Sequence, residues 1–111
     1  MIKSHKDLDV FQRSKKLCPK LVEYAKRFPR EGWFLRDQIC RSGNSITGNI
    51  AEGYGRSTAE FKQYLTRSLG SCNETVNHLE DAINVSFGDK KEGLFLIGEY
   101  EIVGKQLYRL R

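Results

Sequence analysis

The sequence has few of the residues that build catalytic and metal sites. Its 111 residues include two histidines and three cysteines, and Cys18, Cys40 and Cys72 show no C-x-x-C spacing. A di-iron site in a helical bundle needs a Glu-x-x-His motif on two helices, whereas Glu74 and His78 are one residue too far apart. No G-x-S-x-G or H-E-x-x-H motif occurs. The sequence therefore predicts no enzyme, metal site or cofactor, and reduced, mostly buried thiols.

The chain also lacks a long apolar run. The longest one spans residues 94–97, whereas a membrane-spanning helix needs about 20 apolar residues. The basic N-terminus is not followed by the apolar segment of a signal peptide. We therefore expect one domain, residues 1–111, that lies in the cytoplasm and has no membrane partner.

Apolar residues recur at steps of three and four in four segments, and no segment alternates as a strand does. This pattern predicts helices over residues 10–28, 35–54, 58–87 and 90 to the C-terminus. Pro19 is expected to kink the first helix or, as the alternative, to break it so that a new helix begins there. Capping boxes are expected at Asp9, Ser57 and Asp89. Because the connections between these long helices are short, the sequence predicts an all-α, antiparallel up-down-up-down four-helix bundle.

The second predicted helix carries small and polar residues where it should face its neighbours. Its small residues, from Ser42 to Ala51, would let another backbone approach closely. Polar side chains in such places usually have hydrogen-bond partners. We therefore predict a structural polar network, buried or at an interface, formed by Asn49, Glu52, Arg56, Ser71 and Glu74.

The net charge of +5 is distributed unevenly along the chain. Residues 1–41 hold 11 Lys and Arg against 5 Asp and Glu (+6), and residues 42–111 hold 8 against 9 (−1). Clustered cations favour a nucleic-acid backbone or an acidic protein partner, although a solvated basic face would look the same. The candidate nucleic-acid-binding residues are Arg13, Lys15, Lys16, Lys20, Lys26, Arg27, Arg30, Arg36 and Arg41.

Several large apolar residues lie off the main apolar stripes of the predicted helices. They form three pairs: Trp33 with Phe34, Ile50 with Tyr54, and Phe95 with Ile97. Exposed apolar patches on a small domain usually mark interfaces. We therefore expect a closed homo-oligomer.

The sequence resembles the bacterial four-helix-bundle proteins encoded in intervening sequences of 23S rRNA. The resemblance spans nearly the whole chain, and its residues are Asp7-Leu8-Asp9-Val10-Phe11, Phe28-Pro29, Leu35, Gln38, Arg41, Ser45-Ile46, Asn49-Ile50-Ala51-Glu52-Gly53, Arg56, Glu60-Phe61, Leu65, Gly70-Ser71 and Glu74.

That family is in turn similar to the accessory variability determinant of diversity-generating retroelements, a basic pentameric bundle that works with a reverse transcriptase and nucleic acid. The resemblance implies a pentamer as the favoured assembly. Together with the charge pattern it implies a non-enzymatic homo-oligomer that binds nucleic acid, RNA rather than DNA. The alternative is an interaction scaffold for an acidic or polymerase-like protein.

Overall fold

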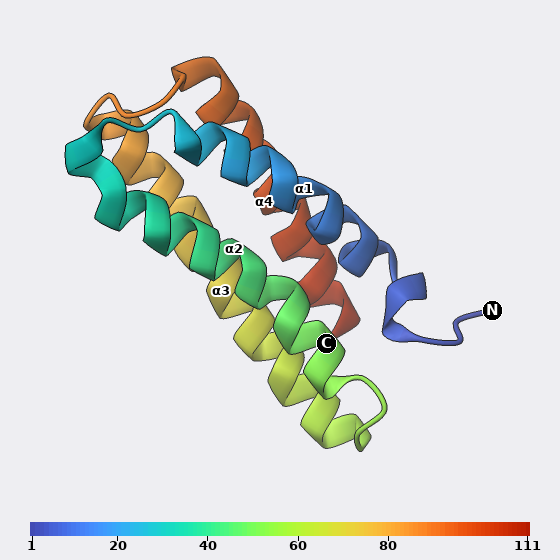
Figure 1. Ribbon diagram of the computed structural model, residues 1–111. Helices are drawn as coiled ribbons and strands as arrows, with labels where there is room; N and C mark the ends of the chain where they lie inside the picture. The colour runs from blue at the N-terminus through green and yellow to red at the C-terminus, as the bar shows by residue number, and fades with distance from the viewer.

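Four α-helices form the protein in the computed structural model, which describes residues 1–111 and contains no strand. They are α1 (Asp9–Lys26), α2 (Trp33–Gly53), α3 (Thr58–Asn84) and α4 (Lys90–Leu110), with 3₁₀ turns at His5–Asp7 and Arg30–Gly32. The chain reverses direction at each connection, and both the α1–α2 and the α3–α4 connections lie at the same end of the bundle (Figure 1). The predicted all-α four-helix bundle is confirmed.

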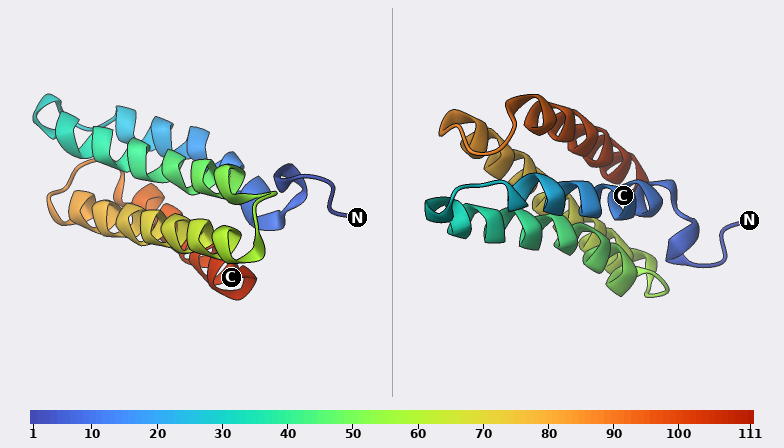
Figure 2. Two further views of the ribbon diagram at one scale, coloured as in Figure 1. Left: turned by 90° about the horizontal axis from the view of Figure 1, so that it is seen from below. Right: turned by 45° about the horizontal axis from the view of Figure 1, so that its top comes forward.

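The helices are arranged as two layers in an elongated molecule of 43 × 22 × 18 Å. One layer holds α1 and α2 and the other holds α3 and α4 (Figure 2). The α2–α3 contact is the most extensive and the α1–α4 contact the least, and no close backbone approach joins α1 to α3 or α2 to α4. Helix α1 is therefore a peripheral element that packs on two neighbours through one face.

Side-chain caps begin α3 and α4 as the sequence predicts. Ser57 Oγ accepts a hydrogen bond from the Glu60 backbone N–H at 3.2 Å. Asp89 Oδ2 accepts one from the Glu92 backbone N–H at 2.9 Å. Each bond satisfies an N–H group that has no partner inside its own helix, and this fixes where the helix begins.

The beginning of α1 differs from the prediction. The box predicted at Asp9 is wrong, because Asp9 is already helical and the N-cap residue, Leu8, makes no side-chain bond. The capping box lies earlier, where Ser4 caps the first 3₁₀ turn and Asp7 Oδ2 accepts from the Ser4 N–H at 3.1 Å. Helix α1 then continues through Pro19 without a break.

Helix α3 ends at Asn84, before the position that the periodicity predicts. Ser86 (φ 62°) and Gly88 (φ 72°) both adopt left-handed backbone conformations, which stop the helix. A Cβ atom on Gly88 would lie 2.8 Å from the Tyr24 ring and 2.9 Å from the Phe28 ring. Glycine at this position therefore allows both the turn and the close packing of the turn on α1.

The interior combines apolar side chains with hydroxyl groups that bond to the backbone or to each other. Ser68 Oγ donates to the Ile46 carbonyl at 2.8 Å, and Thr75 Oγ1 donates to Ser42 Oγ at 2.8 Å. These bonds join α2 to α3. The buried apolar core is Leu8, Val10, Phe11, Leu17, Leu21, Tyr24, Phe28, Leu35, Ile39, Ile46, Ile50, Leu65, Cys72, Leu79, Ala82, Leu96, Tyr100, Val103 and Leu107.

None of the helices has the combination of length and apolarity that a membrane span requires.

Two glycines of α2 permit close contact with both neighbouring helices. A Cβ atom on Gly43 would clash with Leu21 of α1, and one on Gly53 would clash with Tyr64 of α3. Gly48, by contrast, has no atom within 4 Å of its Cβ position. The small residues that could have served an outer interface are thus largely used inside the protomer.

Gly43→Ala and Gly48→Ala form a matched pair in one helix. Gly48→Ala should stabilise the protein by up to about 1 kcal/mol, because alanine is the better helix former. Gly43→Ala should instead destabilise it by about 1–3 kcal/mol, because the new methyl group displaces Leu21. Urea denaturation followed by circular dichroism measures both, and equal effects of the two changes would contradict the close α1–α2 packing.

Candidate nucleic-acid interface

The amphipathic pattern of α1 places its cations on the outside of the bundle. Val10, Leu17, Leu21 and Tyr24 lie at steps of three, four and seven, and all four are buried. The lysines and arginines between them therefore point away from the core. Of the nine predicted binding residues, eight are exposed and only Arg13 is half-buried.

Three of the nine predicted cations have a carboxylate partner. Arg13 Nη1 lies 3.0 Å from Glu99 Oε1, and Lys26 Nζ lies 3.3 Å from Glu23 Oε1. Arg41 pairs with Asp37 on the same helix at 3.5 Å. The other six form no ion pair, and their charges face solvent: Lys15, Lys16, Lys20, Arg27, Arg30 and Arg36.

The cations near the middle of α1 line the groove between α1 and α4. Arg13, Lys16 and Lys20 are all on its walls, as their spacing predicts. Glu99 and Gln106 of α4 form the other wall, and the Gln106 Oε1 atom is buried without a hydrogen-bond partner. The groove is polar, and two of its three cations have no carboxylate partner.

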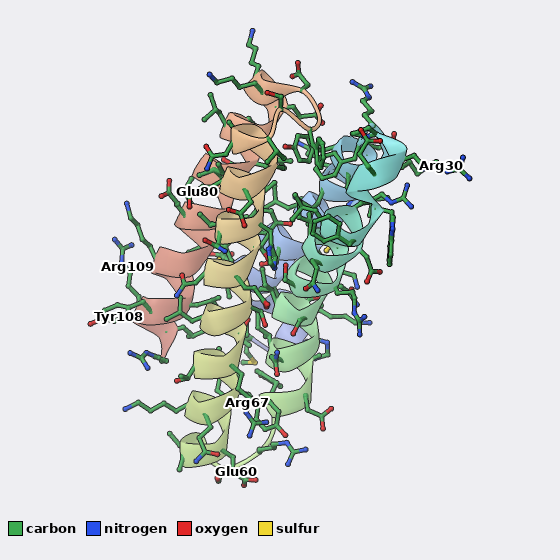
Figure 3. The ribbon with its side chains drawn as sticks, turned by 90° about the vertical axis from the view of Figure 1, so that its left-hand side faces the viewer. Arg30, Glu60, Arg67, Glu80, Tyr108 and Arg109 are labelled. Carbon is green, nitrogen blue, oxygen red and sulfur yellow. The ribbon has the colours of Figure 1, made fainter.

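Lys15 lines a separate hollow between α1 and α2, and Arg41 lies further along α2. The other four cations gather at the end of the bundle where α1 joins α2. Lys26 and Arg36 line a hollow beside Trp33 at this end. Arg27 and Arg30 lie in the intervening connection, and Figure 3 shows Arg30 pointing away from the bundle. The predicted basic residues therefore cover the solvent side of α1 on both flanks, toward α4 and toward α2, and continue onto the first turns of α2.

The five residues predicted as a polar network do not form one network in the protomer. Asn49 and Ser71 are brought together, but through Ser45, which the prediction omitted. Asn49 Nδ2 donates to Ser45 Oγ at 3.0 Å, and Ser71 Oγ donates to the same atom at 2.9 Å. This half-buried cluster joins α2 to α3.

The charged members lie on the surface instead. Arg56 Nη2 contacts Glu52 Oε1 at 2.9 Å and Arg56 Nη1 contacts Glu60 Oε2 at 3.5 Å, all three being exposed. The hydrogen bond to Glu52 raises the pKa of the Arg56 guanidinium. Glu74 is exposed, and its Oε2 atom lies 3.7 Å from the Nε2 atom of His78, one helical turn later. Helical spacing alone placed these carboxylates too close to the helix–helix contact.

Known proteins are similar to this chain in sequence and in fold. A model described as 23S rRNA-intervening sequence protein matches residues 6–109. The chain belongs to this family. A crystal structure of a protein of unknown function from the S23 ribosomal protein family of Bacteroides thetaiotaomicron is similar, with a TM-score of 0.84 and 26% identity over 91% of this chain and 96% of that one. A search of curated proteins gave no match.

This intervening-sequence family member has a second group of cations that the charge count did not reveal. Two guanidinium groups lie over the Tyr64 ring, that of Arg56 at 5.0 Å and that of Arg67 at 4.7 Å from the ring centre. Arg111 lies over the Tyr108 ring at 5.3 Å. The spacing of Tyr64 and Arg67, three residues apart on one helix, was the signal available in the sequence.

The three cysteines of this family member lie inside or near the core. Burial raises the pKa of Cys18 and Cys40, and it raises the pKa of the Cys72 thiol to about 12. The Cys72 Sγ atom donates to the Tyr100 carbonyl at 3.0 Å. Since thiolates are the nucleophilic and metal-binding form, burial makes these thiols poorer nucleophiles and metal ligands. No group of three or more His, Cys, Asp and Glu side chains is arranged to hold a metal ion.

The raised pKa of Cys72 predicts alkaline destabilisation. An unfolded chain loses the thiol proton near pH 9, whereas the folded chain keeps it up to about pH 12. The free energy of unfolding should therefore decrease as the pH rises through this range. For Cys72→Ala the slope of this decrease should be smaller, by the amount that corresponds to about one bound proton. Denaturation at several pH values measures the slope; the same slope in both proteins would contradict the burial of an intact thiol.

Proposed function

We propose that this protein is a non-enzymatic homo-oligomer that binds nucleic acid, RNA in preference to DNA, through the basic surface of α1 and the start of α2. One observation carries the proposal: six exposed cations there have no carboxylate partner. These cations belong to residues 1–41, which carry a net charge of +6, whereas residues 42–111 carry −1. Cations that have no carboxylate partner are available to bind phosphate groups.

The chemistry of these residues suits a phosphate backbone. Each Lys or Arg that contacts a phosphate releases a condensed counterion, so affinity falls as salt increases. Such contacts position the nucleic acid but read little sequence. The family description refers to an intervening sequence of 23S rRNA, and this favours RNA over DNA as the ligand.

Exposed apolar residues on α4 favour self-association. Leu94, Phe95 and Ile102 are 53%, 51% and 39% exposed, and Gly98 between them has no atom within 4 Å of its Cβ position. Together they offer a flat apolar strip that a second copy could cover. A pentameric ring, which the resemblance to the accessory variability determinant implies, would combine five charges of +5 into about +25.

An interaction scaffold for an acidic or polymerase-like protein is the second candidate. The side-by-side placement of cations and apolar rings favours it, since Lys20 Nζ lies 5.5 Å from the centre of the Phe95 ring. Protein interfaces combine apolar cores with charged rims in this way.

Paired lysine substitutions test the proposed surface. Lys16→Gln with Lys20→Gln removes two unpaired cations from the α1–α4 groove, and Lys90→Gln with Lys91→Gln removes two exposed ones at the start of α4. Only the first pair should weaken RNA binding and reduce the slope of log K against log salt, by about 0.7–0.9 for each phosphate that is no longer neutralised. Fluorescence anisotropy titrations at several salt concentrations measure both effects.

Two results would contradict the proposal. Both pairs of substitutions could weaken binding equally, which would indicate a general effect of net charge. RNA binding could also be absent at low salt. Retention of one acidic protein after nuclease treatment would then favour the scaffold.

A further inference from the structure

We propose that Trp33 is a stacking platform for an unpaired base, so that the bound nucleic acid is single-stranded where it contacts the start of α2. The inference rests on the proposed function and specifies which part of the nucleic acid is recognised. It follows from the exposure of the indole ring, the hollow next to it and the charges around that hollow.

The packing of the four helices leaves Trp33 largely exposed to solvent. It is the first residue of α2, its side chain is 61% exposed, and its ring stacks on no other aromatic ring of the chain. Tryptophan is enriched at interfaces, and Trp33 lies next to a second exposed ring, that of Phe34, so that the two form an apolar patch. Aromatic faces bind unpaired bases by stacking, largely without regard to sequence.

A shallow hollow of about 310 Å³ lies beside the ring. Val22 and Cys40 contribute apolar surface, and Lys26, Arg36 and Asp37 contribute charge. Its volume is at the lower limit of the range for small-molecule sites, about 300–1,000 Å³. The space therefore suits a single planar ring system rather than a large ligand.

The charges around the hollow favour a polyanion. Arg36 has no ion pair, and Arg30, in the turn just before Trp33, is also unpaired and points away from the bundle (Figure 3). The one carboxylate in the hollow, Asp37, is partly neutralised by Arg41 at 3.5 Å. A base stacked on Trp33 would thus carry its flanking phosphates toward unpaired guanidinium groups.

A second copy of the chain is the competing occupant of this surface. A two-fold contact through Trp33 would place Lys26, Arg30 and Arg36 near their own counterparts. Such a contact brings like charges together and is opposed by their repulsion. The same cations attract a nucleic-acid strand, so charge complementarity favours the strand.

The test uses the fact that Trp33 is the only tryptophan of the chain. Three RNA probes of equal length are compared: a single strand, a single strand with abasic positions, and a duplex. Anisotropy of a labelled probe reports binding, and tryptophan emission reports stacking. All three probes should bind at low salt, but only the single strand with bases should quench Trp33.

Matched variants separate stacking from charge. Trp33→Ala should weaken binding of the base-bearing single strand by about 5- to 140-fold, the loss expected for one stacked base. Its affinity for the abasic strand should not change. Trp33→Phe should retain most of the affinity, and Phe34→Ala, which removes the adjacent exposed ring outside the hollow, should behave as the unaltered protein.

The outcomes distinguish this inference from the function on which it rests. Binding by anisotropy without quenching, or equal losses for base-bearing and abasic strands in Trp33→Ala, would overturn the stacking role and leave the proposed function intact. A blue shift of Trp33 emission with protein concentration, without RNA, would show that a second copy covers the ring and would also overturn it. Failure of every probe to bind would overturn both.

Discussion

The close approach of α2 to both of its neighbours is the constraint on which the rest of the structure depends. Gly43 leaves room for Leu21 of α1, and Gly53 leaves room for Tyr64 of α3. Because α2 and α3 lie so close together, the hydroxyl of Ser68 reaches the Ile46 carbonyl of α2. A larger residue at either glycine would push the helices apart and break such bonds, because close-packed interiors tolerate little extra volume.

This packing also determines which surface is left for function. Helix α1 contacts α2 and α4 through a single face, so its opposite face can carry lysine and arginine without any cost of burial. Only three of the nine basic residues considered find a carboxylate. The fold therefore presents unpaired cations on the solvent side of α1 and at the start of α2, where an exposed indole ring lies beside them.

The helical periodicity of the apolar residues and the caps at Ser57 and Asp89 were sufficient to predict the four-helix bundle. The errors arose where tertiary packing decides. Ile50 was expected off the apolar stripe of α2 but is buried, because α2 packs on two helices and buries a wider arc than one stripe. Glu52 and Glu74 were expected in a polar network, buried or at an interface, and within the protomer they are not buried, since helical spacing gives a residue's direction only to within about one position.

The basic surface was easier to predict than the polar network. Charged side chains on a peripheral helix are exposed whatever the details of packing. The lysines and arginines of residues 1–41 were therefore correctly predicted to lie on the surface. The Lys26–Glu23 and Arg41–Asp37 pairs follow helical spacing, but the Arg13–Glu99 pair could not be predicted, because Glu99 lies on α4 at the far end of the chain. The exposure of Trp33 was expected, but its place beside the Lys26 and Arg36 hollow needed the fold.

Ultraviolet cross-linking of bound RNA followed by mass spectrometry tests the central claim most directly, because it locates the binding surface on the protein. We expect cross-linked peptides within residues 13–41, from α1 and the start of α2. Cross-links confined to the second cationic group, around Tyr64, Arg67 and Arg111, would contradict the assignment of the nucleic-acid interface to the basic surface of α1.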